Sequence, residues 1–110
     1  MDIDSIRSRC SSGISVDVGW RPLLSDLDAA LTEADPTLRY LVISQKYGRL
    51  VILTTSDTNE EAQQLIRDAE ELASRTCEMC GDTTAVMCQR GSWLRTLCPR
   101  CAAEHRYVAK

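Results

Sequence analysis

Two C-x-x-C pairs near the end of the chain constrain its fold more than any other feature. They are Cys77/Cys80 and Cys98/Cys101, and the 17 residues of Gly81–Leu97 separate them. Each pair places two thiols on one tight turn, so two such turns brought together form a tetrahedral sulfur site, which suits Zn²⁺. The spacing lies in the range of four-cysteine zinc modules. The sequence therefore predicts one structural zinc ion held by these four cysteines.

The residues around the cysteines indicate the kind of module. Gly81 follows the first pair and allows the positive φ of a zinc knuckle. Pro99 suits the first turn of a helix that continues to Tyr107. Between the pairs we expect two strands and a turn, Ala85–Cys88, Trp93–Leu97 and Gln89–Ser92. A knuckle, a hairpin and a ligand-bearing helix make a treble clef, and a zinc ribbon is the alternative.

The six cysteines could instead form disulfides or lie as ordinary buried thiols. The first residues, Met1–Arg7, are polar and start acidic, so we expect no secretory signal. A chain in the reducing cytosol keeps its thiols free for metal. No apolar run approaches the length of about 18 residues that a membrane span requires. We therefore expect a soluble, cytoplasmic protein without a membrane partner.

The formal net charge of −3 is distributed unevenly along the chain. Residues 1–74 carry 7 basic and 13 acidic side chains, whereas residues 75–110 carry 6 basic and 3 acidic ones. An acidic body with a mildly basic zinc end is compatible with a charged partner. A surplus of three positive charges is far below the basic footprint typical of nucleic-acid binding. The same difference also arises when two subregions simply have different solvated faces.

Residues 1–75 read as an α/β body, of which residues 1–13 are expected to be loose. Ile14, Val16 and Val18 alternate with polar residues, which indicates a short strand or an extended lead-in. From Trp20 to Ala34 the apolar residues recur in steps of three and four, the pattern of an amphipathic helix that Pro36 ends. This stripe either packs on the protein's own sheet or binds a partner.

The compositions of Leu38–Gln45 and Leu50–Thr55 favour strands, and Gly48 permits a tight turn between them. Thr58 as N-cap and Glu61 three positions later form a capping box for a second helix that runs to about Arg75. Leu50–Leu53 is apolar on both faces, so helices must cover one face. A third strand, the zinc module or a partner must cover the other face. The expected fold is α+β, an αββα body joined to the module 76–110 without a linker, so that both move as one piece.

Two sets of residues carry a resemblance to known proteins. One is GWRPLL at Gly19–Leu24 with QKYGRL at Gln45–Leu50, and the other is AEELASRTCEMCG at Ala69–Gly81 with GSWLRTLC at Gly91–Cys98. They resemble small uncharacterised bacterial and phage proteins that join an αββα body to a C-terminal C-x-x-C zinc module. Here a second C-x-x-C replaces what is often a Cys and a His. The resemblance implies a fold and a zinc site, and it implies no activity.

The sequence shows no catalytic constellation. Its single histidine, His105, has no triad motif around it and is expected on the surface or behind the metal site, with a ligand role as the alternative. Four thiolates close the coordination shell, whereas a catalytic zinc keeps an open position. Cys88 is expected to be a small buried side chain in a strand, with a reactive thiol or a further ligand as the alternative. Cys10 is expected to be a free thiol. We therefore expect a protein that is not an enzyme.

Two binding functions remain. The first is a zinc-stabilised protein-binding module, an inhibitor or immunity-type protein that occupies the surface of a cognate toxin or effector. Its candidate contact residues are Trp93, Arg95 and Arg90, although Trp93 could equally cap the module's small core. The second is a nucleic-acid-binding regulator that uses Arg90, Arg95, Arg100 and Arg106. The acidic helix containing Glu60–Glu71 would repel phosphate, so the sequence favours the protein-binding function.

Overall fold

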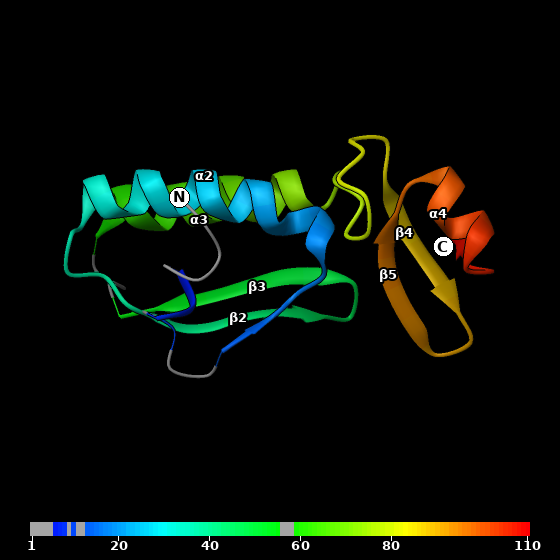
Figure 1. Cartoon of the computed structure of the whole chain (residues 1–110), viewed down its shortest axis with the longest axis horizontal. Coiled ribbons are helices and arrows are strands. Elements are labelled where there is room, and N and C mark those ends of the chain that lie inside the picture. The colour runs from blue at the N-terminus through cyan, green and yellow to red at the C-terminus, as the bar shows by residue number, and fades with distance from the viewer. Residues whose placement is uncertain (1–5, 9, 11–12, 56–58) are drawn as a thin grey trace.

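The computed structural model describes residues 6–8, 10, 13–55 and 59–110. The chain forms a mixed α+β molecule of 42 × 24 × 22 Å, with the body at one end of the long axis and the cysteine module at the other (Figure 1). Its elements in order are β1 (Ile14–Ser15), the 3₁₀ helix η1 (Val18–Trp20), α2 (Arg21–Ala34), β2 (Tyr40–Lys46), β3 (Arg49–Thr54), α3 (Glu60–Ala73), β4 (Val86–Arg90), β5 (Trp93–Leu97), α4 (Pro99–Glu104) and β6 (Val108–Ala109).

The body contains a three-stranded sheet in the order β1-β2-β3, with α2 and α3 lying over one face (Figure 1). β2 and β3 form the expected antiparallel hairpin, and β1 pairs in parallel with β2 through Ile14 and Ile43. The segment before the first helix is therefore a strand at Ile14–Ser15 and a 3₁₀ turn at Val18. Ile6, in the segment expected to be loose, is buried in the same core. Most of residues 1–13 lie outside the described part of the chain.

Helix α2 follows its predicted pattern. Leu23, Leu24, Leu27 and Leu31 are buried against the sheet, so the apolar stripe packs on the protein's own core. The helix begins one residue later than expected because Trp20 occupies the N-cap position. It ends at Ala34, where Asp35 before Pro36 adopts an extended conformation, as the steric effect of proline requires.

The β2–β3 turn consists of Tyr47 and Gly48, which both have positive φ angles, 55° and 80°. Two consecutive positive φ angles are the signature of a type I′ hairpin turn, whose twist matches that of the strands. Leu50 and Ile52 face the helices and are buried. On the opposite face Leu53 remains 52% exposed, because the third strand lies beside β2 and does not cover that face.

Helix α3 differs from the prediction at its start. The predicted N-cap, Thr58, lies outside the described residues, and the N-cap position belongs to Asn59, whose side-chain oxygen accepts a hydrogen bond from the backbone N–H of Ala62 at 3.0 Å. Both residue types are good caps, so the capping-box pattern placed the helix start one residue early. Of the predicted stripe, Leu72 is 40% exposed, whereas Ala73, the last residue of the helix, is buried.

The cysteine module contains a second three-stranded sheet in the order β5-β4-β6. The β4–β5 hairpin was predicted, although its turn is shorter, with β4 extending to Arg90. Helix α4 ends at Glu104 and not at Tyr107, since Arg106 adopts a positive φ of 61° and turns the chain back to pair with β4. Among the described residues, no helix combines the length and apolar character needed to cross a lipid bilayer.

Candidate metal centre

The four predicted cysteines come together at the end of the body. The sulfur atoms of Cys77, Cys80, Cys98 and Cys101 all lie within 4.8 Å of one another, and no disulfide joins any of the six cysteines. The Sγ atoms of Cys80 and Cys98 are 3.6 Å apart. A tetrahedral site with metal–sulfur bonds of about 2.3 Å has sulfur–sulfur edges of about 3.8 Å. The spacing therefore fits a four-coordinate metal ion bound by thiolates.

A tight turn positions the first two ligands. The backbone N–H of Gly81 donates to the carbonyl of Cys77 at 2.9 Å, and the N–H of Cys77 donates to the carbonyl of Asp82 at 2.7 Å. Gly81 has a φ of 86°, the left-handed conformation expected for the residue that closes a zinc knuckle. These backbone hydrogen bonds shape the turn around its sulfur atoms without any contribution from a metal ion.

The start of helix α4 positions the other two ligands. Cys98 is the N-cap of the helix, and its sulfur accepts a hydrogen bond from the backbone N–H of Cys101 at 3.4 Å. Pro99 occupies the first helical position, where its missing N–H costs nothing. The helix thus begins at one ligand and carries the next in its first turn, as the sequence predicted.

The electrostatics of the four thiols are those of a crowded site. Burial raises the pKa of Cys77, but hydrogen bonds from the backbone at Cys98, Cys80 and Met79 outweigh it and lower the pKa to about 7. Burial and the neighbouring thiols raise the pKa of Cys101. One thiolate therefore forms readily, whereas further negative charge requires a cation. A bound metal ion supplies that charge and deprotonates its cysteine ligands.

The remaining cysteines and the histidine lie outside this cluster. Cys88 is buried in β4 and donates to the carbonyl of Val86 at 3.3 Å, so it is the small core side chain that was expected. Cys10 donates to the carbonyl of Gly13 at 3.2 Å. His105 is the exposed C-cap of α4 and is not part of the four-sulfur group.

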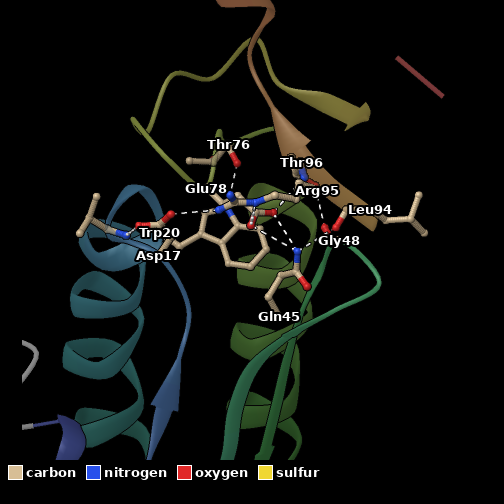
Figure 2. Close-up of polar contacts among 10 residues, drawn as sticks. Asp17, Trp20, Gln45, Gly48, Thr76, Glu78, Leu94, Arg95 and Thr96 are labelled. Atoms are coloured by element: carbon tan, nitrogen blue, oxygen red, sulfur yellow. Dashed lines mark hydrogen bonds and ion pairs between the residues drawn. The ribbon is translucent and has the colours of Figure 1, made fainter. Parts of the chain in front are cut away.

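The knuckle is joined to the body through the side chain of Glu78, the residue that directly follows Cys77 in the turn (Figure 2). Glu78 is only 2% exposed. Its carboxylate accepts hydrogen bonds from Arg95 Nε at 2.8 Å, from the backbone N–H of Thr96 at 2.9 Å and from Gln45 Nε2 at 3.2 Å. Arg95 also pairs with Asp17 at 2.9 Å. One buried carboxylate thus connects the knuckle, β5, β2 and the segment before α2.

Backbone contacts reinforce this junction. The indole N–H of Trp20 donates to the carbonyl of Thr76 at 2.8 Å (Figure 2). The N–H of Gly19 donates to the carbonyl of Glu78 at 2.9 Å. A Cβ atom on Gly19 would lie 2.2 Å from the carbonyl oxygen of Cys77, so only glycine permits this approach. The body therefore contacts the backbone of the turn that carries Cys77 and Cys80 directly.

The three candidate partner-binding residues have different surroundings. Trp93 is 69% exposed at the start of β5 and does not cap the module's core. Arg90 stacks over the ring of Tyr107 at 4.7 Å and donates to the carbonyl of His105 at 2.9 Å. Arg95 is engaged by Asp17 and Glu78, and its side chain is only 24% exposed. Of the three, Trp93 is the one most available to a partner.

Sequence reasoning missed the residues that hold the two parts together, namely Asp17, Gly19, Gln45 and Glu78. Asp17 and Arg95 are 78 positions apart in the chain, and Gln45 and Leu94 are 49 apart. No local periodicity links such residues. The one signal available was Glu78 itself, a charged residue placed in the sequence between Cys77 and Cys80.

Comparisons with protein-family models, with curated proteins and with solved structures find no match to this chain. The resemblance suggested by its motifs therefore stays a prediction.

Proposed function

We propose that this chain is a non-enzymatic, zinc-stabilised protein-binding module that inhibits a cognate toxin or effector by occupying its surface. The observation that carries the proposal is Trp93, a large aromatic side chain that is 69% exposed on a strand held in place by the cysteine module. Tryptophan is strongly enriched among the residues that dominate binding energy at protein interfaces. A rigid exposed tryptophan contacts a partner at low entropic cost.

The metal in this proposal is one structural Zn²⁺ ion held by Cys77, Cys80, Cys98 and Cys101. Support comes from the all-sulfur donor set and from the order of a knuckle, a hairpin and a helix that carries the second pair, which is a treble-clef arrangement. When bound, zinc cross-links the two ligand pairs. Four thiolates fill a tetrahedral shell, so this chain's residues leave no coordination position for a substrate.

In this proposal the body is an αββα unit extended by β1, and residues 76–110 form the zinc module that packs rigidly on it. Support comes from the Glu78 carboxylate and from the contact between Trp20 and Thr76, which tie the module to the body without a linker. We also assign the protein to the cytosol. All six cysteines have free thiols in the structure, which suits a reducing compartment.

Charge favours a protein partner over nucleic acid. The alternative function, a regulator that binds nucleic acid, would need the arginines of the zinc end to reach phosphates. Arg95 is occupied by two carboxylates. The outer face of α3 is acidic and would repel a phosphate backbone. With Arg95 occupied, the surplus of positive charge at the zinc end is small for a nucleic-acid footprint.

The test is capture of partners from a host lysate by the full-length, zinc-loaded protein at about 150 mM salt, beside titrations with DNA and RNA. We expect a defined protein partner that is retained after salt washes and lost after treatment with a metal chelator. Nucleic-acid affinity that rests on a few arginines should fall steeply between about 50 and 200 mM salt. Submicromolar nucleic-acid binding that persists at the higher salt, with no protein retained, would replace the inhibitor function with the regulator function.

A further inference from the structure

The turn of the β2–β3 hairpin lies against strand β5 of the β4–β5 hairpin, where the body meets the cysteine module. The β2–β3 turn points toward β5 (Figure 1), and a hollow of about 530 Å³ separates Lys46 and Tyr47 on one side from Ser92, Trp93 and Leu94 on the other. A second hollow of about 680 Å³ continues from Trp93 past Arg90 and Tyr107. We call the four outward side chains Lys46, Tyr47, Arg90 and Trp93 the two-hairpin surface.

Tyr47 occupies a position that costs backbone energy. It is 82% exposed, and its φ of 55° lies in the left-handed region that bulky side chains rarely adopt. Asparagine or glycine fits this position of a type I′ turn without that cost. An exposed tyrosine contributes almost no packing in return. A strained residue without a structural benefit points to a function, here contact with another molecule.

The β2–β3 turn is held firmly against the β4–β5 hairpin. The hydroxyl of Thr96 donates to the carbonyl of Gly48 at 2.7 Å, and Gln45 Nε2 donates to the carbonyl of Leu94 at 3.0 Å (Figure 2). A Cβ atom on Gly48 would lie 2.5 Å from the sulfur of Met87, so the turn rests directly on β4. The hollow between Tyr47 and Trp93 is therefore preformed, which lowers the entropic cost of filling it.

The charges around the hollows are unbalanced. Asp17 and Glu78 line only the second hollow, where they share the single guanidinium of Arg95 and keep one net negative charge between them. Lys46 and Arg90 form no ion pair with any residue that the structure describes. The outer faces of α2 and α3, in contrast, are acidic and repel an acidic partner. An acidic segment is thus attracted to the two-hairpin surface and turned away from the helices.

We propose that the two-hairpin surface binds an acidic segment of the partner protein that places a large apolar side chain between Tyr47 and Trp93. This inference rests on the proposed protein-binding function and names the surface and the chemistry of its partner. The apolar side chain fills the preformed hollow, and the flanking carboxylates face Lys46 and Arg90. Aromatic rings beside basic groups also suit single-stranded nucleic acid, and that occupant is an outcome of the test.

The first experiment selects ligands from a random 16-residue peptide library displayed on phage, with the full-length, zinc-loaded protein as bait at about 150 mM salt. We expect the selected peptides to carry Asp or Glu next to Trp, Phe or Leu. A synthetic copy of the best peptide is then titrated by fluorescence polarisation. Peptides without enriched carboxylates, or tighter binding of a single-stranded oligonucleotide than of any peptide, would overturn the proposal.

Variants then locate the binding site. Trp93→Ala should lower the affinity for the selected peptide about 30-fold or more, the loss typical of a central interface residue. Tyr47→Asn should weaken it while the melting temperature of the protein rises. Lys46→Glu should lower the affinity for the acidic peptide. A second peptide, in which lysines replace the carboxylates, should bind this variant again. Val108→Ala is the matched control, because Val108 is exposed on the opposite edge of the same sheet and should change nothing.

The outcomes distinguish failure of the proposed binding surface from failure of the proposed protein-binding function. A lysate partner that binds Trp93→Ala and Tyr47→Asn as tightly as the wild type would refute this surface while the protein-binding function stands. Failure to select any peptide, together with failure to capture any protein, would refute both. Unchanged binding of the selected peptide to Trp93→Ala would also exclude the two-hairpin surface.

Discussion

Replacing Glu78 with alanine tests how firmly the cysteine module is held on the body. The substitution removes the acceptor for Arg95, Thr96 and Gln45 at a position that is 2% exposed. Removing one partner of a buried charge pair costs about 3–5 kcal/mol, because the other charge remains without compensation. Arg95 keeps its contact with Asp17, so we expect a loss near the lower limit, about 3 kcal/mol.

The matched control is Asp17→Asn, which removes the other carboxylate from the same arginine. The side chain of Asp17 is 38% exposed, and ion pairs this accessible contribute only about 0.2–1 kcal/mol. The two variants therefore remove carboxylates from one guanidinium at different depths. The difference in the free energy of unfolding between them measures the contribution of burial.

The assay is urea unfolding of the zinc-loaded protein. The chain has two tryptophans, so a Trp93→Phe background leaves Trp20, at the junction of body and module, as the single reporter. Metal release followed with a chromophoric chelator gives a second, independent transition. We expect both transitions to coincide and to shift together in Glu78→Ala. A loss no larger than that of Asp17→Asn, or a body that unfolds at its original midpoint after metal release, would refute the reasoning.

Four further substitutions test other parts of the structure. Tyr47→Asn should stabilise the protein by about 1 kcal/mol in thermal unfolding, because it removes strain from a left-handed residue; an unchanged or lower melting temperature would contradict this. Gly19→Ala should destabilise by about 3 kcal/mol or more, since its Cβ would meet the backbone of Cys77 and Glu78. Gly91→Ala, with a φ of 62° and nothing within 4 Å, should lose only about 1 kcal/mol in the same assay. Burial raises the pKa of Glu70, so the wild type should lose stability relative to Glu70→Gln as the pH rises above 4.5, the usual pKa of the group. A constant difference across urea titrations at several pH values would show that the carboxylate is not buried enough to matter.

The elements that the sequence predicted well have strong local patterns. The stripe of Leu23, Leu24, Leu27 and Leu31 is long enough to define a helix, and Pro36 defines its end. The strands β1 and β6 contain two residues each, too few for any periodicity to appear. They form because the chain passes beside β2 and β4, which is a consequence of the tertiary fold and not of local sequence.

The same distinction holds for the candidate site. The four cysteines were predictable, because a turn of fixed spacing brings each pair together and the metal chemistry restricts what two such pairs do. The exposure of Trp93 was left open, since an aromatic residue at a strand start can face either side. Arg95, a basic residue on the edge strand β5, was considered for partner binding, but the sequence could not show that its guanidinium pairs with Asp17 and Glu78. Burial at a junction between two parts of a chain is decided by their packing.

The metal content of the purified protein tests the central claim most directly. Full-length protein prepared without chelators should contain one zinc per chain by elemental analysis, with metal–sulfur distances of about 2.3 Å by X-ray absorption. Cys98→Ser should lose the zinc and unfold the module, because metal-binding energy in such modules becomes folding energy. Cys10→Ser, which alters a cysteine outside the cluster, should retain both. Wild-type protein that folds without stoichiometric zinc, or that forms disulfides among Cys77, Cys80, Cys98 and Cys101, would contradict the account.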